Sequence, residues 1–322
     1  MVGKRIRWGV IGPGKIAHPF VKDLLLSGEG IVTAVAGRTP ERTKAFCELY
    51  AIEKMHTSPR ALAESNDVDV VYIASPHSSH YEHALSCLNA GKAVLCEKPL
   101  TMKVDHTQSL IQASKKNQVF LMEALWSRFL PSIATALRLV HEGTIGDLLH
   151  IHADFGFSAP YNPSSRLYDP TLGGGCLLDI GIYPVFLAYA LKGMPTNIRA
   201  RSQKAANGVD DAIAIIMDFG NSCMATLEAT FRTDTECRAQ IAGSKGRLLL
   251  PGRWHEGTTL IEELNGQSPK TRHFPRKFHG FLHEIEETHR MLRNGGTESP
   301  YWTHDDSLNI SKLLSTIHEL AA

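Results

Sequence analysis

Three polar side chains in this sequence have the types and local settings that hydride transfer requires. Lys98 directly follows a short apolar run, and Asp179 and Tyr183 lie within a second, largely apolar stretch. Asp179 and Tyr183 are four residues apart, so both side chains would project from one face of a helix. The glycine triplet at 173–175 would let a backbone segment or a ligand approach closely. Together these residues suggest an active site.

Hydride transfer to or from a carbinol carbon also needs a group that exchanges the hydroxyl proton. Tyr183 suits this role if a nearby cation stabilises its phenolate, and Lys98 is the candidate for that cation. Asp179 would orient the substrate hydroxyl or the Lys98 ammonium. Acid–base help of this kind accelerates a reaction by about 10² to 10⁴. Taken singly, Lys98 also fits an exposed loop lysine, and Tyr183 a core tyrosine with a bonded hydroxyl.

A glycine-rich turn near the N-terminus predicts a site for a dinucleotide pyrophosphate. Residues 12–17 read Gly-Pro-Gly-Lys-Ile-Ala and fit the pattern G-x-G-x-x-G/A. The segment follows a buried strand and opens a helix, the context that makes this short pattern informative. Gly12 would allow the tight turn, and Gly14 would let the backbone approach the phosphates. The N–H groups that open the helix, around Lys15 and Ile16, would face the anion; a generic glycine-rich turn is the alternative.

The end of the second expected strand bears on the choice between NAD and NADP. An Asp or Glu at this place accepts from the ribose 2′-hydroxyl and repels a 2′-phosphate. This strand instead ends in Gly37, Arg38 and Thr39, with Arg42 close behind. Because a guanidinium pairs with phosphate through its planar fork, we predict NADP(H) as the cofactor. NAD is the alternative if Arg38 only stacks on the adenine.

The first third of the chain alternates short apolar runs with helical stretches. Strands are expected at 6–11, 31–36, 68–74, 93–96 and 119–122, and helices at 16–26, 40–50, 79–90 and 104–117. Buried strands that alternate with helices are typical of a doubly wound parallel sheet covered on both faces. Residues 1–124 are therefore predicted to form a Rossmann domain that binds the dinucleotide.

Beyond residue 125 the apolar pattern changes to a period of two. Residues 223–231 and 237–241 alternate between apolar and polar side chains, which indicates antiparallel strands with one covered face. Further helices are expected at 132–142, 176–191, 279–293 and 304–320. The predicted fold class is α/β: the Rossmann domain is followed by a C-terminal α+β domain, residues 125–322, with a large, mostly antiparallel open sheet that binds substrate and mediates dimerisation.

Composition and charge argue against several other classes of protein. The 34 Lys and Arg residues against 33 Asp and Glu lack the basic footprint of a nucleic-acid binder. No apolar stretch approaches the length of a membrane span, and the N-terminus carries no signal peptide pattern. Six scattered cysteines without a C-x-x-C pair fit free thiols, so we expect a cytoplasmic protein. His77, His80 and His83 recur every three residues without a matching Cys or carboxylate cluster, so we expect no metal site.

In this order the motifs resemble those of the glucose-fructose oxidoreductase, inositol dehydrogenase and rhizopine-catabolism (Gfo/Idh/MocA) family, over essentially the whole chain. The likeness rests on residues 12–17, on Ser75-Pro76-His77 with His80, on Glu97-Lys98-Pro99, on Gly174-Gly175 leading to Asp179-Ile180-Gly181, and on Gly243-Ser244-Lys245-Gly246. Within the family the chain is most similar to the dimeric dihydrodiol dehydrogenases and the NADP-dependent D-xylose dehydrogenases. Residues 123–129 and Tyr183 carry this closer likeness.

The resemblance implies roles for particular residues. Lys98, Asp179 and Tyr183 would form the catalytic group; many members carry His at the position of Tyr183, and His titrates nearer neutrality. The residues implied at the cofactor cleft are Ser75, His77, His80 and Glu97, with Trp126 and Arg128 beside the nicotinamide and its phosphates. The candidates for the substrate pocket are Trp126, Phe157 and Trp254, although ordinary core or surface packing is favoured over a pocket role for Phe157 and Trp254. The open sheet often forms the dimer interface in the family, so a homodimer or larger homo-oligomer is expected.

The function expected from these features is that of an NADP-dependent oxidoreductase, with NAD as the other possible cofactor. It would transfer a hydride to or from a hydroxyl-bearing carbon of a sugar, a cyclic polyol or a trans-dihydrodiol. The alternative is a non-catalytic NAD(P)-binding sensor or regulator of the same fold. The presence of Lys98, Asp179 and Tyr183 together argues against that alternative.

Overall fold

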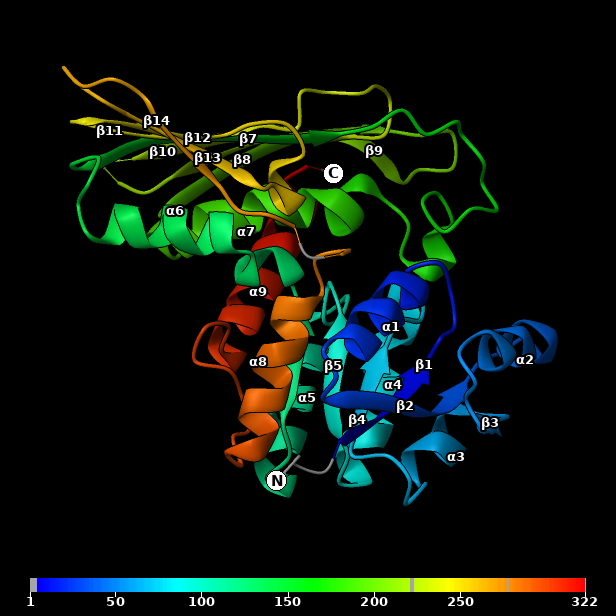
Figure 1. Ribbon diagram of the computed structural model, residues 1–322. Helices are drawn as coiled ribbons and strands as arrows, with labels where there is room; N and C mark the ends of the chain where they lie inside the picture. Colours follow the sequence, from blue (N-terminus) through cyan, green and yellow to red (C-terminus); the bar gives the residue numbers. More distant parts are fainter. Residues whose placement is uncertain (1–4, 221–222, 277, 322) are drawn as a thin grey trace. The chain divides into compact units, whose positions relative to one another are not determined.

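The computed structural model describes residues 5–220, 223–276 and 278–321 (Figure 1). The chain divides into two compact units, and each consists of two segments of the chain. The first unit comprises Met1–Trp126 and Lys277–Leu308, and the second comprises Ser127–Arg276 and Asn309–Ala322. Residues 1–4, which entered the argument against a signal peptide, lie outside the described residues.

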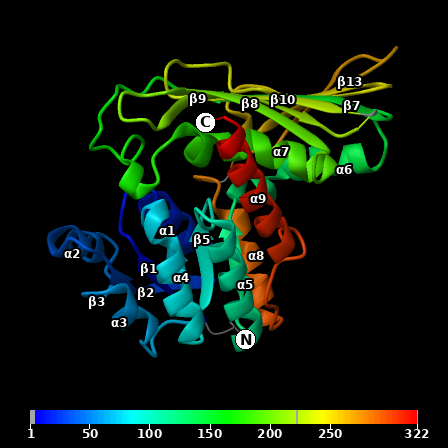
Figure 2. The ribbon, with the colours of Figure 1, turned by 180° about the vertical axis from the view of Figure 1, so that it is seen from behind.

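A six-stranded parallel sheet forms the centre of the first unit, with the strand order β3-β2-β1-β4-β5-β6. The strands are β1 (Ile6–Ile11), β2 (Gly30–Ala36), β3 (Lys54–His56), β4 (Val70–Ile73), β5 (Ala93–Glu97) and β6 (Leu121–Ala124). The helices between them are α1 (Ala17–Leu26), α2 (Pro40–Leu49), α3 (Pro59–Ala63), η1 (His77–Ser79), α4 (His80–Asn89) and α5 (Val104–Asn117), with α4 and α5 beside β5 in Figure 2. Since β1 lies between β2 and β4, the topology reverses at β1, as in dinucleotide-binding sheets. The Rossmann prediction is confirmed, while β3 and α3 were not predicted.

The segment from 278 to 308 returns to the first unit, although the sequence placed it in the second domain. It contains α8 (Leu282–Arg293) and the start of α9 (His304–Leu320). Asp23 of α1, fully buried, accepts hydrogen bonds from the backbone N–H groups of His279 (3.1 Å) and Phe281 (2.9 Å). Trp8 Nε1 also donates to His289 Nε2 at 3.0 Å. These contacts join residues far apart in sequence, which is why a boundary drawn from local patterns missed them.

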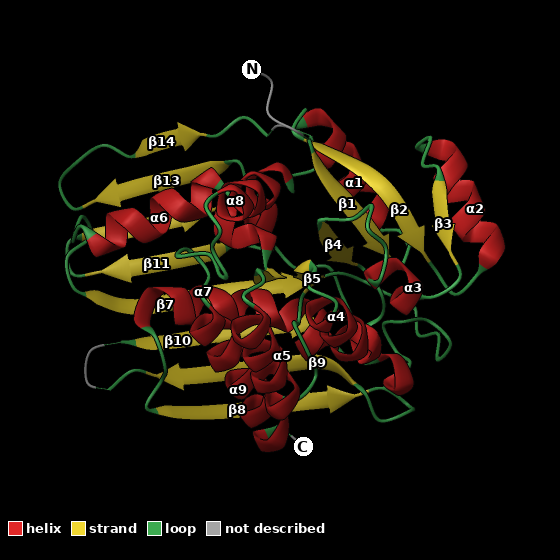
Figure 3. Ribbon diagram, turned by 90° about the horizontal axis from the view of Figure 1, so that it is seen from below, coloured by secondary structure: helices red, strands yellow, loops and turns green. Residues whose placement is uncertain are grey.

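Eight strands form the sheet of the second unit, in the order β14-β13-β12-β11-β7-β10-β9-β8 (Figure 3). The strands are β7 (Leu148–Gly156), β8 (Asn197–Lys204), β9 (Asp210–Asp218), β10 (Met224–Thr230), β11 (Ala239–Gly243), β12 (Gly246–Leu250), β13 (Thr259–Leu264) and β14 (Lys270–His273). The pair β7 and β10 is parallel and the other named pairs are antiparallel, which confirms a mostly antiparallel sheet.

Helices cover one face of this second sheet. The helical elements of the unit are η2 (Trp126–Phe129), α6 (Pro131–His141), η3 (Pro170–Leu172), a π-helix (Leu177–Gly181), α7 (Ile182–Lys192) and η5 (Trp254–Glu256). Figure 1 shows α6 and α7 along one side of the sheet. The predicted inner face of β10 is buried as expected: Ala225, Leu227 and Ala229 are at most 2% exposed.

One helical run tests the expectation of no membrane span. Residues Pro170–Lys192 are long and apolar enough to cross a membrane by length and composition, which the sequence analysis did not recognise. However, 78% of the most apolar window is buried within the fold, as in the core helix of a globular unit. The apolar composition is therefore explained by packing beneath the sheet.

Candidate active site

The turn between β1 and α1 has the geometry expected of a pyrophosphate cradle. Gly12 adopts a φ of +88°, and a Cβ at this position would lie 2.8 Å from the backbone of Ala74, so only glycine fits. A Cβ on Gly14 would meet only the Gly12 oxygen, at 4.0 Å, so the space above the turn is open. Gly14, Lys15 and Ile16 are exposed, and Ile16 is 40% exposed despite its apolar side chain. These residues fit a bound dinucleotide, because the backbone is accessible where a helix begins.

Arg38, which follows β2, lies near enough to His83 of α4 for its charge to act on that ring. Gly37 packs so tightly on the turn that an added Cβ would lie 2.8 Å from Pro13 Cδ, and Arg38, Thr39 and Arg42 follow it as exposed residues. His83 Nδ1 lies 3.0 Å from Ser75 Oγ. Burial lowers the pKa of His83, the charge of Glu82 opposes the change, and the charge of Arg38 lowers the pKa further. Arg38 is thus a cation beside the strand ends, where a 2′-phosphate would need one.

His80 lies behind the cleft surface instead of lining it. The side chain is 0% exposed, with Nδ1 2.8 Å from the Pro99 oxygen and Nε2 2.9 Å from the Ser75 oxygen. Burial lowers the pKa of His80 to about 4, although both carbonyls favour the charged ring. The ring therefore lies between the loop after β4 and the loop after β5, and in its neutral form it donates a hydrogen bond to one of the two carbonyl oxygens. His77 and Ser75 are only half-buried, so they stay candidates for the cleft surface.

The end of β5 presents Lys98 between firmly held neighbours. Glu97 is 8% exposed and accepts a hydrogen bond of 2.5 Å from the Tyr72 hydroxyl. On the other side, the backbone N–H of Leu100 donates to Glu123 Oε1 at 2.7 Å. Lys98 is half-buried between these anchors. Since ligands bind beyond the carboxyl ends of parallel strands, this placement suits a catalytic ammonium.

Trp126 and Arg128 lie on either side of the division between the units. Trp126 is 8% exposed and stacks on Phe281, with ring centroids 5.1 Å apart. Phe281 comes from the returning segment, so the sequence analysis had no signal for this pairing. Arg128 is half-buried and belongs to the second unit.

Asp179 and Tyr183 lie where a π-helix passes into α7. The expected helix over 176–191 is present, but residues Leu177–Gly181 form a π turn, a feature frequent at functional sites. Asp210 Oδ2 accepts from the backbone N–H of Leu177 at 2.7 Å and so fixes the start of the helix. Gly175 is required here, because its φ is +128° and a Cβ would lie 2.5 Å from Asp210 Oδ1.

Gly174 permits the close approach that the triplet predicts, and the approaching group is the chain itself. A Cβ on Gly174 would lie 2.9 Å from the Leu167 oxygen and from the backbone of Asp169. The same loop carries Arg166, whose Nη1 donates to Asp179 Oδ1 at 2.8 Å. Sequence analysis missed Arg166, because its loop shows neither periodicity nor a motif.

Tyr183 lies among aromatic side chains from distant parts of the second unit. Its exposure is 6%, and its ring centroid is 5.6 Å from that of Phe155 and 5.3 Å from that of His255. Phe155 and His255 stack at 3.8 Å. These rings pack around the Tyr183 ring and shield it from water. Neither Phe155 nor His255 was predicted, since they lie outside recognisable motifs.

Of the proposed pocket walls, Trp254 belongs to the core. Its side chain is 0% exposed, and Nε1 donates to the Asp154 oxygen at 2.9 Å. The prediction of a substrate contact is therefore wrong, because the ring has no accessible surface. Phe157 is half-buried with its ring 5.3 Å from that of Phe231. Over the described ranges 5–220, 223–276 and 278–321, no three His, Cys, Asp or Glu side chains group as a metal site would require.

Comparison with known protein families agrees with this geometry. Residues 6–125 match an oxidoreductase family described as having an NAD-binding Rossmann fold, and residues 133–249 match the Gfo/Idh/MocA C-terminal domain. The chain belongs to the Gfo/Idh/MocA family. This Gfo/Idh/MocA protein is an NAD(P)-dependent oxidoreductase, as its sequence indicated.

Individual relatives of this Gfo/Idh/MocA oxidoreductase match over nearly their full length. The trans-1,2-dihydrobenzene-1,2-diol dehydrogenases of Xenopus laevis and Danio rerio are 36% and 34% identical; the matches cover 96% of this chain and 96% and 95% of theirs. A solved aldose-aldose oxidoreductase from Caulobacter crescentus, complexed with glycerol, is 25% identical with a TM-score of 0.90, over 99% of this chain and 98% of that one. A 3-ketoreductase from Actinomadura kijaniata, in complex with NADP and TDP-benzene, is 27% identical with a TM-score of 0.88 over the same shares.

Proposed function

We propose that this protein is a cytoplasmic NADP-dependent dehydrogenase of small diols or sugars. The observation that carries the proposal is the pair Asp179 and Tyr183, both 6% exposed, on adjoining helical turns with an arginine and aromatic rings around them. A buried carboxylate and a phenol suit a substrate with more than one hydroxyl group. The relatives named for diol and aldose oxidation point to the same substrate class.

The residues proposed to hold the cofactor come from the loops that follow strands of the first sheet, with the addition of Arg128 from the second unit. They are Gly12, Gly14, Lys15 and Ile16 for the pyrophosphate, Arg38, Thr39 and Arg42 for the ribose phosphate, Ser75 and His77 beside it, and Glu97, Lys98, Trp126 and Arg128 toward the nicotinamide. When bound, the nicotinamide accepts or returns the hydride. The exposed Arg38 favours NADP over NAD, because a 2′-phosphate gains a charge-assisted hydrogen bond from it.

The proposed proton transfer uses Tyr183. In the oxidation direction the substrate hydroxyl gives its proton to the Tyr183 oxygen, while the carbon loses hydrogen with its electron pair. A nearby cation stabilises such a phenolate, and Lys98 is the residue proposed for this role from the resemblance to the family. Asp179 accepts a hydrogen bond from a substrate hydroxyl and so orients it. The rings of Phe155 and His255 exclude water, which strengthens these electrostatic interactions.

The test measures the reduction of NADP⁺ and NAD⁺ with trans-1,2-dihydrobenzene-1,2-diol, D-xylose and a panel of related diols and sugars. Turnover is expected with NADP⁺, and Tyr183→Phe should lower kcat by about 10² to 10⁴ with cofactor binding retained. Lys98→Met and Asp179→Asn should likewise lower kcat with cofactor binding retained. Tight NADP⁺ binding without turnover on any compound would refute the dehydrogenase and favour the sensor.

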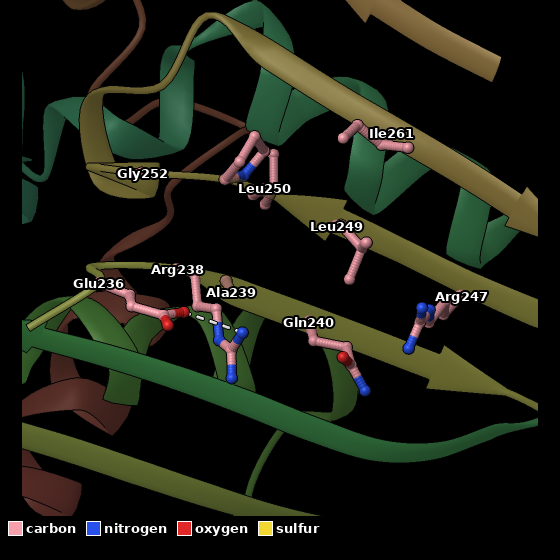
Figure 4. Close-up of a pocket in the computed structure, with 10 residues that line it drawn as sticks. Glu236, Arg238, Ala239, Gln240, Arg247, Leu249, Leu250, Gly252 and Ile261 are labelled. Atoms are coloured by element: carbon pink, nitrogen blue, oxygen red, sulfur yellow. Dashed lines mark ion pairs between the residues drawn. The ribbon is translucent and has the colours of Figure 1, made fainter. Parts of the chain in front are cut away.

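The first unit is proposed to bind the cofactor and the second to bind the substrate. The protein is also proposed to form a homodimer through the open sheet of the second unit. The face of the sheet opposite α6 and α7 exposes Ile216 (43%) and Met224 (45%). A hollow of about 310 Å³ lies on this face, lined by Arg238, Gln240, Leu249 and neighbouring residues of β11 to β13. Figure 4 shows these side chains. Exposed apolar side chains across a flat sheet suit a partner surface. Sedimentation of the wild type and of Ile216→Glu tests this: a dimer that the substitution dissociates is expected, and a monomeric wild type would contradict it.

A further inference from the structure

Arg166 forms an ion pair with Asp179 that the sequence did not indicate. Its Nη1 lies 2.8 Å from Asp179 Oδ1, and its Nη2 lies 3.4 Å from Oδ2. We propose that Arg166 is a positioning residue that keeps the Asp179 carboxylate charged and fixes its rotation for the substrate. This inference rests on the proposed function, in which Asp179 orients a substrate hydroxyl.

The exposures of the two side chains distinguish this pair from an ordinary surface ion pair. The Asp179 side chain is 8% exposed, whereas the Arg166 side chain is 59% exposed. A pair between two exposed side chains contributes little. A carboxylate withdrawn from water, however, depends on its partner to remain charged. Arg166 suits this task because a guanidinium keeps its charge at every pH at which an enzyme works.

The backbone beside Arg166 is held in place by the segment that precedes Asp179. The N–H of Gly175 donates to the Leu167 oxygen at 2.9 Å, and the N–H of Gly174 donates to the Asp169 oxygen at 2.9 Å. The Asn207 side chain donates to the Tyr168 oxygen at 2.5 Å. The glycines thus place the arginine loop and the aspartate helix against each other, and the guanidinium reaches the carboxylate from a fixed base.

The two hydrogen bonds from Arg166 to Asp179 differ in length. Asp179 Oδ1 accepts the short bond of 2.8 Å, whereas Oδ2 receives the longer contact of 3.4 Å. Oδ1 is therefore the oxygen that Arg166 holds most closely, and the second contact fixes the rotation of the carboxylate about its Cβ–Cγ bond.

The experiment compares the wild type with Arg166→Met, Arg166→Lys and Arg166→Ala, using NADP⁺ with trans-1,2-dihydrobenzene-1,2-diol and with D-xylose. Misplacing the carboxylate should lower kcat of Arg166→Met by about 10- to 100-fold. The Kd for NADP⁺, measured by protein fluorescence, should stay within about twofold of the wild type, because the proposed cofactor contacts are retained. Arg166→Lys should recover part of kcat, since it restores the charge without the planar fork.

Chemical rescue separates positioning from a merely structural role. Millimolar guanidinium should raise kcat of Arg166→Ala, whereas ammonium at the same concentration should not. Gly174→Ala should lower kcat as Arg166→Met does, although Arg166 itself is unchanged. The added Cβ would lie 2.9 Å from the Leu167 oxygen and so displace the loop that carries Arg166.

The matched control is Arg232→Met, which breaks another ion pair of the same unit. Arg232 Nε lies 2.8 Å from Asp211 Oδ1, with side-chain exposures of 44% and 12%. This variant should leave kcat unchanged. Full activity of Arg166→Met, with Asp179→Asn inactive, would overturn the role of Arg166 and leave the proposed function standing. Unchanged activity of Asp179→Asn and Tyr183→Phe, or no turnover by the wild type, would overturn the proposed function and this inference with it.

Discussion

Glu284 of α8 is a buried carboxyl group whose replacement should change how the stability of the protein depends on pH. Its side chain is 0% exposed, and within the described part of the chain neither carboxyl oxygen has a hydrogen-bond partner. Burial raises the pKa of Glu284 well above its ordinary value, and the nearby charges of Glu97 and Asp23 raise it further. The folded protein therefore holds this proton to a higher pH than the unfolded chain, in which the group ionises near about pH 4.3.

The pH dependence of stability follows from this difference. Between the two pKa values the folded state holds a proton that the unfolded state has lost, so the free energy of unfolding falls as the pH rises. The contribution is complete below the unfolded-state pKa and disappears as the pH rises through the folded-state pKa. The slope is about 1.4 kcal/mol per pH unit. Glu284→Gln cannot ionise, so its free energy of unfolding relative to the wild type should rise with pH above the unfolded-state pKa, by up to about 1.4 kcal/mol per pH unit.

Urea unfolding followed by tryptophan fluorescence measures this gain, since Trp8 lies in the same unit as Glu284. The free energies of unfolding of the two proteins are compared at several pH values. The contributions of all other titrating groups cancel in the difference between the two proteins. Glu286→Gln is the control: its side chain is 57% exposed on the same helix, and the change should stay below about 0.5 kcal/mol throughout. If the free energies of unfolding of Glu284→Gln and of the wild type depend on pH in the same way, burial does not raise the pKa of Glu284, and the argument is refuted.

Three further substitutions test separate parts of the molecule. Gly12→Ala, with φ at +88° and its Cβ 2.8 Å from the Ala74 backbone, should weaken NADP⁺ binding by at least about tenfold in a fluorescence titration; unchanged binding would contradict the cradle. Arg38→Ala should weaken NADP⁺ binding by about 10- to 100-fold and leave NAD⁺ binding within about threefold, whereas equal losses would rule out a phosphate contact. Trp254→Phe should lower the free energy of unfolding by about 1–3 kcal/mol, because the Asp154 oxygen loses its donor, without altering the KM for the diol; a raised KM would return this ring to the pocket.

The sequence by itself determined the features that depend on neighbouring residues. The glycine turn at 12–17, the alternation of buried strands and helices, and the period of two in β10 all come from local steric and hydrophobic constraints. The spacing of Asp179 and Tyr183 likewise predicts a shared helical face whether the turn is α or π. The glycine triplet at 173–175 predicts that another group approaches the backbone closely, and this approach is present at Gly174. The structure identifies the approaching group as the backbone from Leu167 to Asp169.

Only the tertiary structure decided which distant groups meet. The hydrogen bonds from His279 and Phe281 to Asp23 return a segment to the first unit across a separation of 256 and 258 residues. The motif spacing of His80 is the same whether the ring faces a cofactor or, as here, bridges two carbonyl groups. Arg166 lies in a loop without any periodic pattern, so its pairing with the candidate catalytic carboxylate had no local signal. Such contacts depend on the packing of whole elements, and side-chain pairing at that range leaves no trace in the spacing of residues.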